Sequence, residues 1–110
     1  MSLSNSQFHD LVDATQRNLE DILDDSDADI DIENSAGSIT LTIENRHQVI
    51  LTRQEPLKQL WLADRSGGFH FDYDSSVSQW RCDANQRTLI DMLGEILQAH
   101  TALDFDLSSL

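Results

Sequence analysis

The pattern of hydrophobic residues predicts a helix near the start of the chain. Apolar side chains recur at helical spacing between residues 8 and 23, so they share one face of a helix. Ser4 and Gln7 have the spacing of a capping box, and Leu3 then lies opposite Phe8 as a hydrophobic staple. The face that we expect to be buried consists of Phe8, Leu11, Val12, Thr15, Leu19, Ile22 and Leu23.

From residue 27 onwards the pattern has a period of two, which is typical of β-strands. Acidic and apolar residues alternate over residues 27–33, and in SITLTIE the side chains of Ile39, Leu41 and Ile43 are expected to face the core. The segments QVILTR, KQLWLA, FHFDY and SQWRC follow as further strands, with turns at DRSGG and DSS. Because these connections are short, we expect neighbouring strands to be antiparallel.

A second amphipathic helix is predicted from Gln86 to Thr101, with its apolar residues between positions 89 and 97. In the tail, Leu103, Phe105 and Leu107 alternate with polar residues and are expected to close the end of the helix pair. The order of elements is helix, strands, helix. We therefore predict an α+β fold, a two-layer α-β sandwich in which two helices pack on one face of a twisted antiparallel sheet.

The length of 110 residues fits a single domain over residues 1–110. No apolar run approaches the roughly 20 residues of a membrane span, and the opening MSLSNSQFHD lacks the basic and apolar parts of a secretory signal. Cys82 is the only cysteine, which excludes an intrachain disulfide and a thiolate-rich metal site. These features predict a cytoplasmic protein whose single thiol is inert.

The formal net charge of −13 is concentrated near the N-terminus. Residues 1–33 hold ten acidic residues and one basic residue, Arg17. Such a cluster favours a binding surface for metal cations or for a basic protein, and it disfavours nucleic acid as a ligand. A DNA-mimicking inhibitor is a less favoured alternative. The densest part of the cluster consists of Glu20, Asp21, Asp24, Asp25, Asp27, Asp29, Asp31 and Glu33.

These acidic residues are unfavourable for the helix that carries them. Like charges four residues apart, such as Glu20 and Asp24, cost about 0.2–0.5 kcal/mol per pair, and they lie at the negative end of the helix dipole. Asp13 is expected to pair with Arg17. The acidic residues of segment 29–33 fit two roles, either a ridge continuous with the helix end or protection of an edge strand against aggregation. We expect the crowded acids to serve function at a cost in stability.

Carboxylate oxygens are hard ligands that suit ferrous and ferric iron, manganese, calcium, magnesium and lanthanides. Because no loop encloses these carboxylates, each bound ion should keep several waters and bind weakly. An EF-hand starting at Asp25 is not supported, since Ile30 stands at its glycine position and Ala36 at its glutamate position.

Histidine offers one additional candidate metal site. His9 and Asp13 are four residues apart beside the acidic face and have the spacing of a chelating pair, although a solvent-exposed His9 is the interpretation we favour. His47, His70 and His100 have no partner at ligand spacing. No motif of a nucleophile with its base and no phosphate-binding loop is present, so we do not expect catalysis by this chain.

The two tryptophans are expected on opposite faces of the sheet. In QLWLA, Leu60 and Leu62 occupy the core face and leave Trp61 outside, where contact with a partner and shallow packing against neighbouring side chains such as Arg53 fit equally well. Trp80 is expected in the core.

Four segments, RQEP (53–56), QLWLA (59–63), GGFHFD (67–72) and WRCD (80–83), resemble the frataxin family, in particular its bacterial CyaY-type members. The opening SQFHDL and the acidic helix end also match, so the resemblance covers essentially the whole chain. The chain differs in the link DDSDADID between helix and strand, which is shorter than in some relatives.

The resemblance implies an α-β sandwich that binds iron weakly and acts in iron–sulfur cluster assembly. It implies contact with the cysteine desulfurase and the iron–sulfur scaffold of that machinery, without nucleic acid or membrane, by a chain that is monomeric without metal. Two hypotheses share the acidic ridge. In the first it accepts iron and delivers it to the scaffold, and in the second it docks on the desulfurase and regulates it, with metal as a modulator or a bystander. We favour the docking and regulatory role, with weak iron binding. The implied metal residues are Glu20, Asp21, Asp24, Asp25, Asp27, Asp29 and Asp31, and Trp61 and Glu33 are the candidate partner-binding residues.

Overall fold

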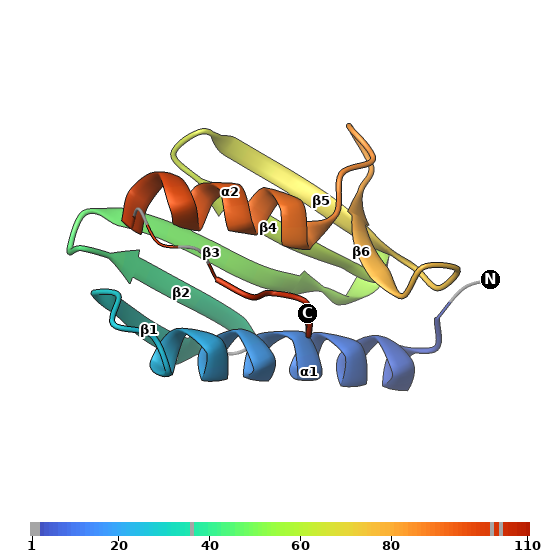
Figure 1. The fold of residues 1–110 in the computed structure, drawn as a ribbon. Helices are drawn as coiled ribbons and strands as arrows, with labels where there is room; N and C mark the ends of the chain where they lie inside the picture. The colour runs from blue at the N-terminus through green and yellow to red at the C-terminus, as the bar shows by residue number, and fades with distance from the viewer. Residues whose placement is uncertain (1–2, 36, 102, 104) are drawn as a thin grey trace.

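Two helices cover one face of a six-stranded antiparallel sheet in the computed structural model, which describes residues 3–35, 37–101, 103 and 105–110 (Figure 1). The strands are paired in chain order from β1 to β6, so each described strand neighbours the next one in sequence. This arrangement confirms the predicted two-layer α+β sandwich. The elements are α1 (Asn5–Asp24), β1 (Ile30–Ser35), β2 (Ser38–Ile43), β3 (His47–Gln54), the 3-10 helix η1 (Glu55–Leu57), β4 (Gln59–Asp64), β5 (Gly67–Asp74), β6 (Gln79–Cys82) and α2 (Leu89–Thr101).

Helix α1 begins as its sequence predicts. The Ser4 hydroxyl accepts a hydrogen bond from the Gln7 backbone N–H at 3.1 Å, and the Gln7 side chain accepts one from the Ser4 N–H at 3.0 Å, which completes the capping box. Leu3 is half-buried and packs against the core, as a hydrophobic staple requires. The buried face of α1 consists of Phe8, Val12, Thr15, Gln16, Leu19 and Leu23.

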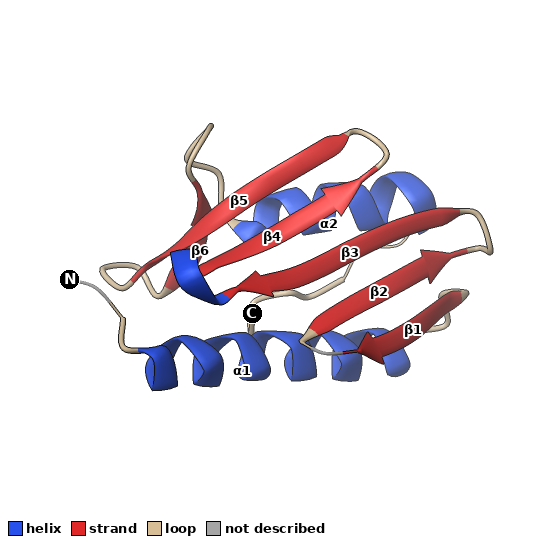
Figure 2. Ribbon diagram, turned by 180° about the vertical axis from the view of Figure 1, so that it is seen from behind, coloured by secondary structure: helices blue, strands red, loops and turns tan. Residues whose placement is uncertain are grey.

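The core lies between the helices and the inner face of the sheet. Ile39, Leu41 and Ile43 of β2 are buried as predicted. Trp80 is also buried, and its indole N–H donates a hydrogen bond to the Thr15 hydroxyl at 3.0 Å, which satisfies the only polar atom of the ring. Figure 2 shows the opposite face of the sheet, which neither α1 nor α2 covers. Polar and aromatic side chains of that face are therefore available to a partner.

Two boundaries differ from the sequence prediction. Strand β1 begins at Ile30 instead of Asp27, because the preceding residues end α1 and form a turn. Helix α2 begins at Leu89 instead of Gln86, because Gln86 has a positive φ of 64° and Thr88 still bridges to β6. The Thr88 hydroxyl then accepts a hydrogen bond from the Asp91 N–H at 3.2 Å, as an N-cap does.

The C-terminal tail runs back from the end of α2 between the two helices (Figure 1). Leu107 is buried, and Phe105 is half-buried against the core. Asn18 of α1 fixes the end of the tail by donating a hydrogen bond to the Ser109 carbonyl at 3.0 Å. Leu103 is 42% exposed, so the predicted closure of the helix pair involves Leu107 and Phe105 but not Leu103.

Candidate functional site

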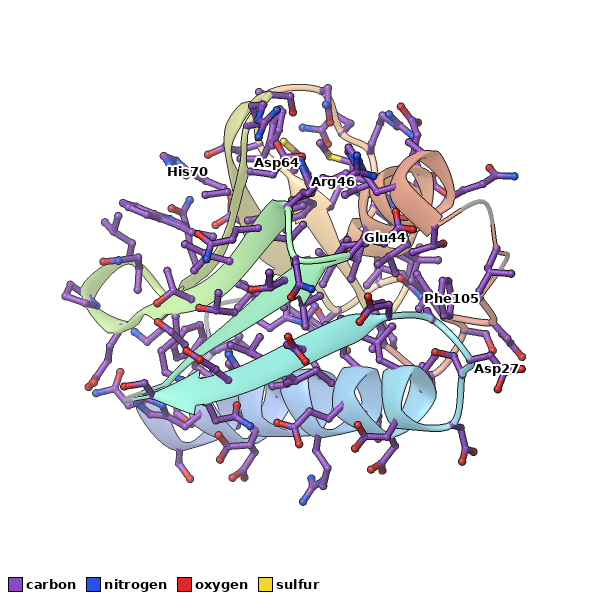
Figure 3. The ribbon with its side chains drawn as sticks, turned by 90° about the vertical axis from the view of Figure 1, so that its left-hand side faces the viewer. Asp27, Glu44, Arg46, Asp64, His70 and Phe105 are labelled. Carbon is purple, nitrogen blue, oxygen red and sulfur yellow. The ribbon has the colours of Figure 1, made fainter. Side chains whose placement is uncertain are left out.

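The acidic ridge runs along the last turns of α1, the connection that follows and the outer side of β1. Glu20 is half-buried and its other members are exposed. Figure 3 views this end of the molecule, with β1 lying over α1 and Asp27 at the connection between them. We define the acidic ridge as the metal residues that the family resemblance implies, which are Glu20, Asp21, Asp24, Asp25, Asp27, Asp29 and Asp31.

Local contacts align the two parts of the ridge. The side-chain amide of Asn34 donates a hydrogen bond to the Glu20 carboxylate, which ties the far end of β1 to α1. Ile30 and Ile32 of β1 pack half-buried against the core, so the intervening Asp31 points outward. Helix and strand carboxylates therefore lie on adjacent exposed surfaces of one edge of the protein.

The connection between α1 and β1 is held by backbone contacts. The Leu23 carbonyl at the helix end accepts hydrogen bonds from the Ser26 backbone N–H at 3.1 Å and from the Ser26 hydroxyl at 2.7 Å. The Asp29 carbonyl accepts a hydrogen bond from the Glu44 N–H at 2.8 Å. This second contact brings the β2–β3 turn, with the exposed Glu44 carboxylate, beside the ridge, which sequence spacing alone does not indicate.

The ridge carboxylates have no arginine or lysine partner among the residues that the structure describes. The ion pairs that arginines form there involve acidic residues elsewhere: Arg46 with Glu44, Arg53 with Asp13, Arg81 with Asp74 and Arg87 with Glu95. Because nothing neutralises the ridge locally, its charges repel one another and attract cations or basic surfaces.

The ridge is open and is not a preformed metal cage. In the described part of the chain, no three His, Cys, Asp or Glu side chains are grouped closely enough to hold a metal ion. A hard cation on this surface would be held by one or two carboxylates and would keep most of its waters.

His9 and Asp13, the additional candidate metal site, are held by Arg53 of β3. The Arg53 guanidinium donates to Asp13 at 2.6 Å and to the His9 Nδ1 at 2.8 Å, while the His9 Nε2 lies 3.3 Å from the Glu55 carboxylate. The hydrogen bond from Arg53 holds the pKa of Asp13 below its usual value. A metal ion chelated by His9 and Asp13 would have to displace Arg53. The pairing of Asp13 with Arg17 expected from the sequence is wrong, because Arg53 takes that place.

Trp61 faces outward, as predicted, and is half-buried. The side chain that it stacks on is His70, where Arg53 was expected. The Trp61 ring stacks on His70, its cross-strand partner in β5, with a centroid distance of 4.2 Å and an interplanar angle of 16°. The indole N–H donates to the Gln59 side-chain carbonyl at 3.0 Å, and the Gln59 amide donates to Asp72 at 3.2 Å and Asp83 at 3.4 Å. These contacts fix the ring on the outer face.

One polar cluster lies outside every site proposed from the sequence. His47, at the start of β3, contacts the buried carboxylate of Asp64 and stacks on His100 of α2. Because residues alternate in direction along a strand, His47 points inward like the buried Val49 and Leu51. The inward direction of His47 could therefore have been predicted from the sequence. The approach of Asp64 and His100 depends on strand register and helix packing, which local spacing does not reveal.

No helix in ranges 3–35 and 37–101 combines the length and the apolar content needed to cross a membrane. Cys82 is fully buried.

Sequence and structure comparisons identify relatives of the chain. The sequence model of the frataxin-like domain matches residues 1–103. The iron-sulfur cluster assembly protein CyaY of Pseudomonas fluorescens strain Pf0-1 is 56% identical over 110 residues and 100% of both chains. The protein of the same name from Pseudomonas entomophila strain L48 is 57% identical over 108 residues, which cover 96% of this chain and 98% of the relative.

Solved structures agree with these relatives. A frataxin from Psychromonas ingrahamii superposes with a TM-score of 0.87 at 28% identity and covers 96% of this chain and 98% of its own. A trimeric frataxin from the yeast Saccharomyces cerevisiae, complexed with ferrous iron, gives a TM-score of 0.69 at 26% identity over 94% of this chain and 90% of its own.

Proposed function

The chain belongs to the frataxin family, and from this premise we propose that it is an iron-binding regulator of iron–sulfur cluster assembly. It docks through the acidic ridge on a basic surface of the cysteine desulfurase in the cytoplasm and modulates the rate of cluster formation. Iron binds the ridge weakly and modulates this contact, and the chain itself is not catalytic and is monomeric without metal. The observation that carries the proposal is a row of exposed carboxylates without basic partners in the described structure.

Charge supports docking as the main role of the ridge. Exposed like charges on rigid elements produce a field that extends about 8 Å at physiological ionic strength and steers an oppositely charged surface. Metal binding on the same carboxylates is supported by their hard oxygen chemistry and by the yeast frataxin with ferrous iron. The openness of the ridge supports weak binding, because each ion keeps water as most of its ligands.

An anaerobic titration with ferrous iron tests the metal part of the proposal. Paramagnetic iron on the ridge should broaden the backbone amide signals of residues 20–31 and leave those of α2 intact. Persistence of the ridge signals in millimolar iron would remove iron from the proposal and leave the ridge as a docking surface for a basic protein. Loss centred on His9 would instead locate iron at the additional site.

Binding kinetics with the purified desulfurase test the docking part. The double variant Asp24→Asn with Asp25→Asn should lower the association rate by about tenfold at low salt, and raised salt should reduce the difference. A matched control, Asp91→Asn with Glu95→Gln, removes the same charge from α2 and should change the rate by less than about twofold. Equal effects of the two double variants would mean that net charge, and not the ridge, drives association.

The outer face of the sheet is proposed as the contact for the iron–sulfur scaffold, with Trp61 at its centre and Glu33 at the β1 edge. An aromatic ring with fixed orientation loses little entropy on binding, which suits an interface anchor. Trp61→Ala should weaken scaffold binding by about tenfold or more. Ile50→Ala, a matched apolar truncation on the same face, should have a smaller effect. Unchanged binding of Trp61→Ala would exclude this face.

A further inference from the structure

A buried histidine links three elements at one end of the molecule. The side chain of His47 is 9% exposed and that of Asp64, at the end of β4, is 4% exposed, with 3.2 Å between the His47 Nε2 and the Asp64 Oδ2. The ring of His100, in the last turn of α2, stacks on the His47 ring with a centroid distance of 3.6 Å and an interplanar angle of 15°. This stack joins the C-terminal end of α2 to the sheet.

The geometry of the pair does not fit a metal centre. The lone pairs of an imidazole lie in the plane of the ring, and the His47 and His100 planes are nearly parallel. Their lone pairs therefore do not converge on one ion. The described residues accordingly contain no group of three ligands arranged for a metal.

Each ring lies close to negative charge. His47 faces the Asp64 carboxylate, which also accepts hydrogen bonds from the Ser66 N–H at 2.9 Å and hydroxyl at 2.6 Å. Burial acts to raise the pKa of Asp64, but these hydrogen bonds and that of His47 outweigh it and leave the pKa below its usual value, so the carboxylate stays charged. His100 lies at the negative end of the α2 dipole, which favours a cation there.

The remaining charged groups around the pair come from two turns. A cavity of about 500 Å³ reaches both rings and is lined by Ile43, Glu44, Arg46, His47, Arg65 and His100. Arg46 pairs with Glu44 at 3.3 Å, so these two charges largely offset each other. Arg65, in the β4–β5 turn, adds positive charge, and the cavity gives water access to the rings. The labels of Asp64, Arg46 and Glu44 in Figure 3 mark this end of the protein.

We propose that the stacked His47–His100 pair is a pH-sensitive latch that holds the end of α2 on the sheet and opens when both rings are protonated. One proton is favourable, because a charged imidazolium stacks well on a neutral aromatic ring and has Asp64 as a counter-ion. A second proton puts two cations in face-to-face contact beside Arg65, and Asp64 can neutralise only one of them. The rings separate, and the last turn of α2 loses its contact with the sheet.

The consequence is local and reversible. The release is confined to the last turn of α2, because Leu107 and the contact between Asn18 and Ser109 still hold the end of the tail. Acidification therefore opens one end of the helix layer before the protein unfolds.

Histidine ring signals in NMR, followed from about pH 8 to pH 5, test the latch in the full chain. We expect the ring signals of His47 and His100 to change together because their protonation is coupled, and that of His70 to change independently of them. Across the change of the His47 and His100 signals, amide hydrogen exchange of residues 97–101 should accelerate by about tenfold relative to that of α1, after correction for intrinsic exchange. Independent changes of the two signals with unchanged relative exchange would overturn the proposal.

Two variants separate protonation from packing. His100→Phe keeps an aromatic ring on His47 but removes the second proton, so the exchange of residues 97–101 should lose its acid-dependent acceleration. His70→Phe, which removes a histidine from the outer face, should keep the acceleration. If His100→Phe retained the acid response, the stack would not be its origin, whatever the stability of the variant at neutral pH.

Discussion

Neutralising Asp24 should stabilise the protein, although it removes a charged group from a well-formed helix. Asp24 is the last residue of α1, and Asp25 caps the helix. Glu20 precedes Asp24 by one turn, and no basic residue lies in the last turn of α1. The Asp24 carboxylate therefore faces both a like charge and the negative end of the helix dipole.

The expected gain follows from these two interactions. An acidic side chain at a helix C-terminus costs about 0.3–1 kcal/mol, and a like-charge pair four residues apart costs about 0.2–0.5 kcal/mol. Asp24→Asn should therefore raise the free energy of unfolding by about 0.5–1.5 kcal/mol at low salt. For a domain of this size that corresponds to an increase of roughly 2–6 °C in Tm.

Thermal unfolding followed by circular dichroism measures the effect at low salt and in about 1 M sodium chloride, where screening should remove most of it. Asp91→Asn is the matched control, because Asp91 lies in the first turn of α2, where the dipole favours an acid. The control should lower Tm at low salt. A lower Tm for Asp24→Asn, or a gain that salt does not reduce, would refute the electrostatic account of the ridge.

Three further substitutions test other parts of the structure. Thr15→Val leaves the buried indole N–H of Trp80 without its acceptor and should lower the free energy of unfolding in urea by about 1–3 kcal/mol. Gly37→Ala should cost about 1–2 kcal/mol by the same measurement, because Gly37 has a φ of +86° and a Cβ would lie 2.9 Å from the Arg53 Nε. Asp64→Asn should lower the free energy of unfolding by about 2 kcal/mol near neutral pH. The pKa of the Asp64 carboxyl is lower in the folded state than its usual value of 3.8, so the charged carboxylate stabilises the fold at pH values above 3.8. In urea titrations at several pH values, the difference from the parent should diminish as pH falls through the lower, folded pKa; a constant difference would contradict this assignment.

Features that depend on local sequence were predictable. The capping box of Ser4 and Gln7 and the alternation in β2 were correct, because both follow from residues within a few positions of one another. The acidic ridge could be predicted for the same reason, since its members lie close together in the sequence. Its ligands and partners stay predictions.

Contacts between distant segments were not predictable from spacing. Asp13 and Arg17 have the spacing of a helical ion pair, yet Asp13 pairs with Arg53, which lies 40 positions away. The stack of His47 on His100 likewise requires the strand register and the position of α2. Both contacts form where a strand packs under a helix, and a sequence pattern specifies which face is buried without specifying which residues meet across the interface.

The distribution of basic residues explains why the ridge keeps its charge. The chain has only seven lysines and arginines. Four arginines pair with acids outside the ridge in the described structure, and Arg53 also connects α1 to β3. Among the residues that the structure describes, no ion pair with a basic side chain offsets the repulsion along the ridge, so a cation or a basic partner that bound there would reduce it. Because such a ligand binds the folded state, binding and stability are linked, and Tm should rise with the concentration of a cation that occupies the ridge.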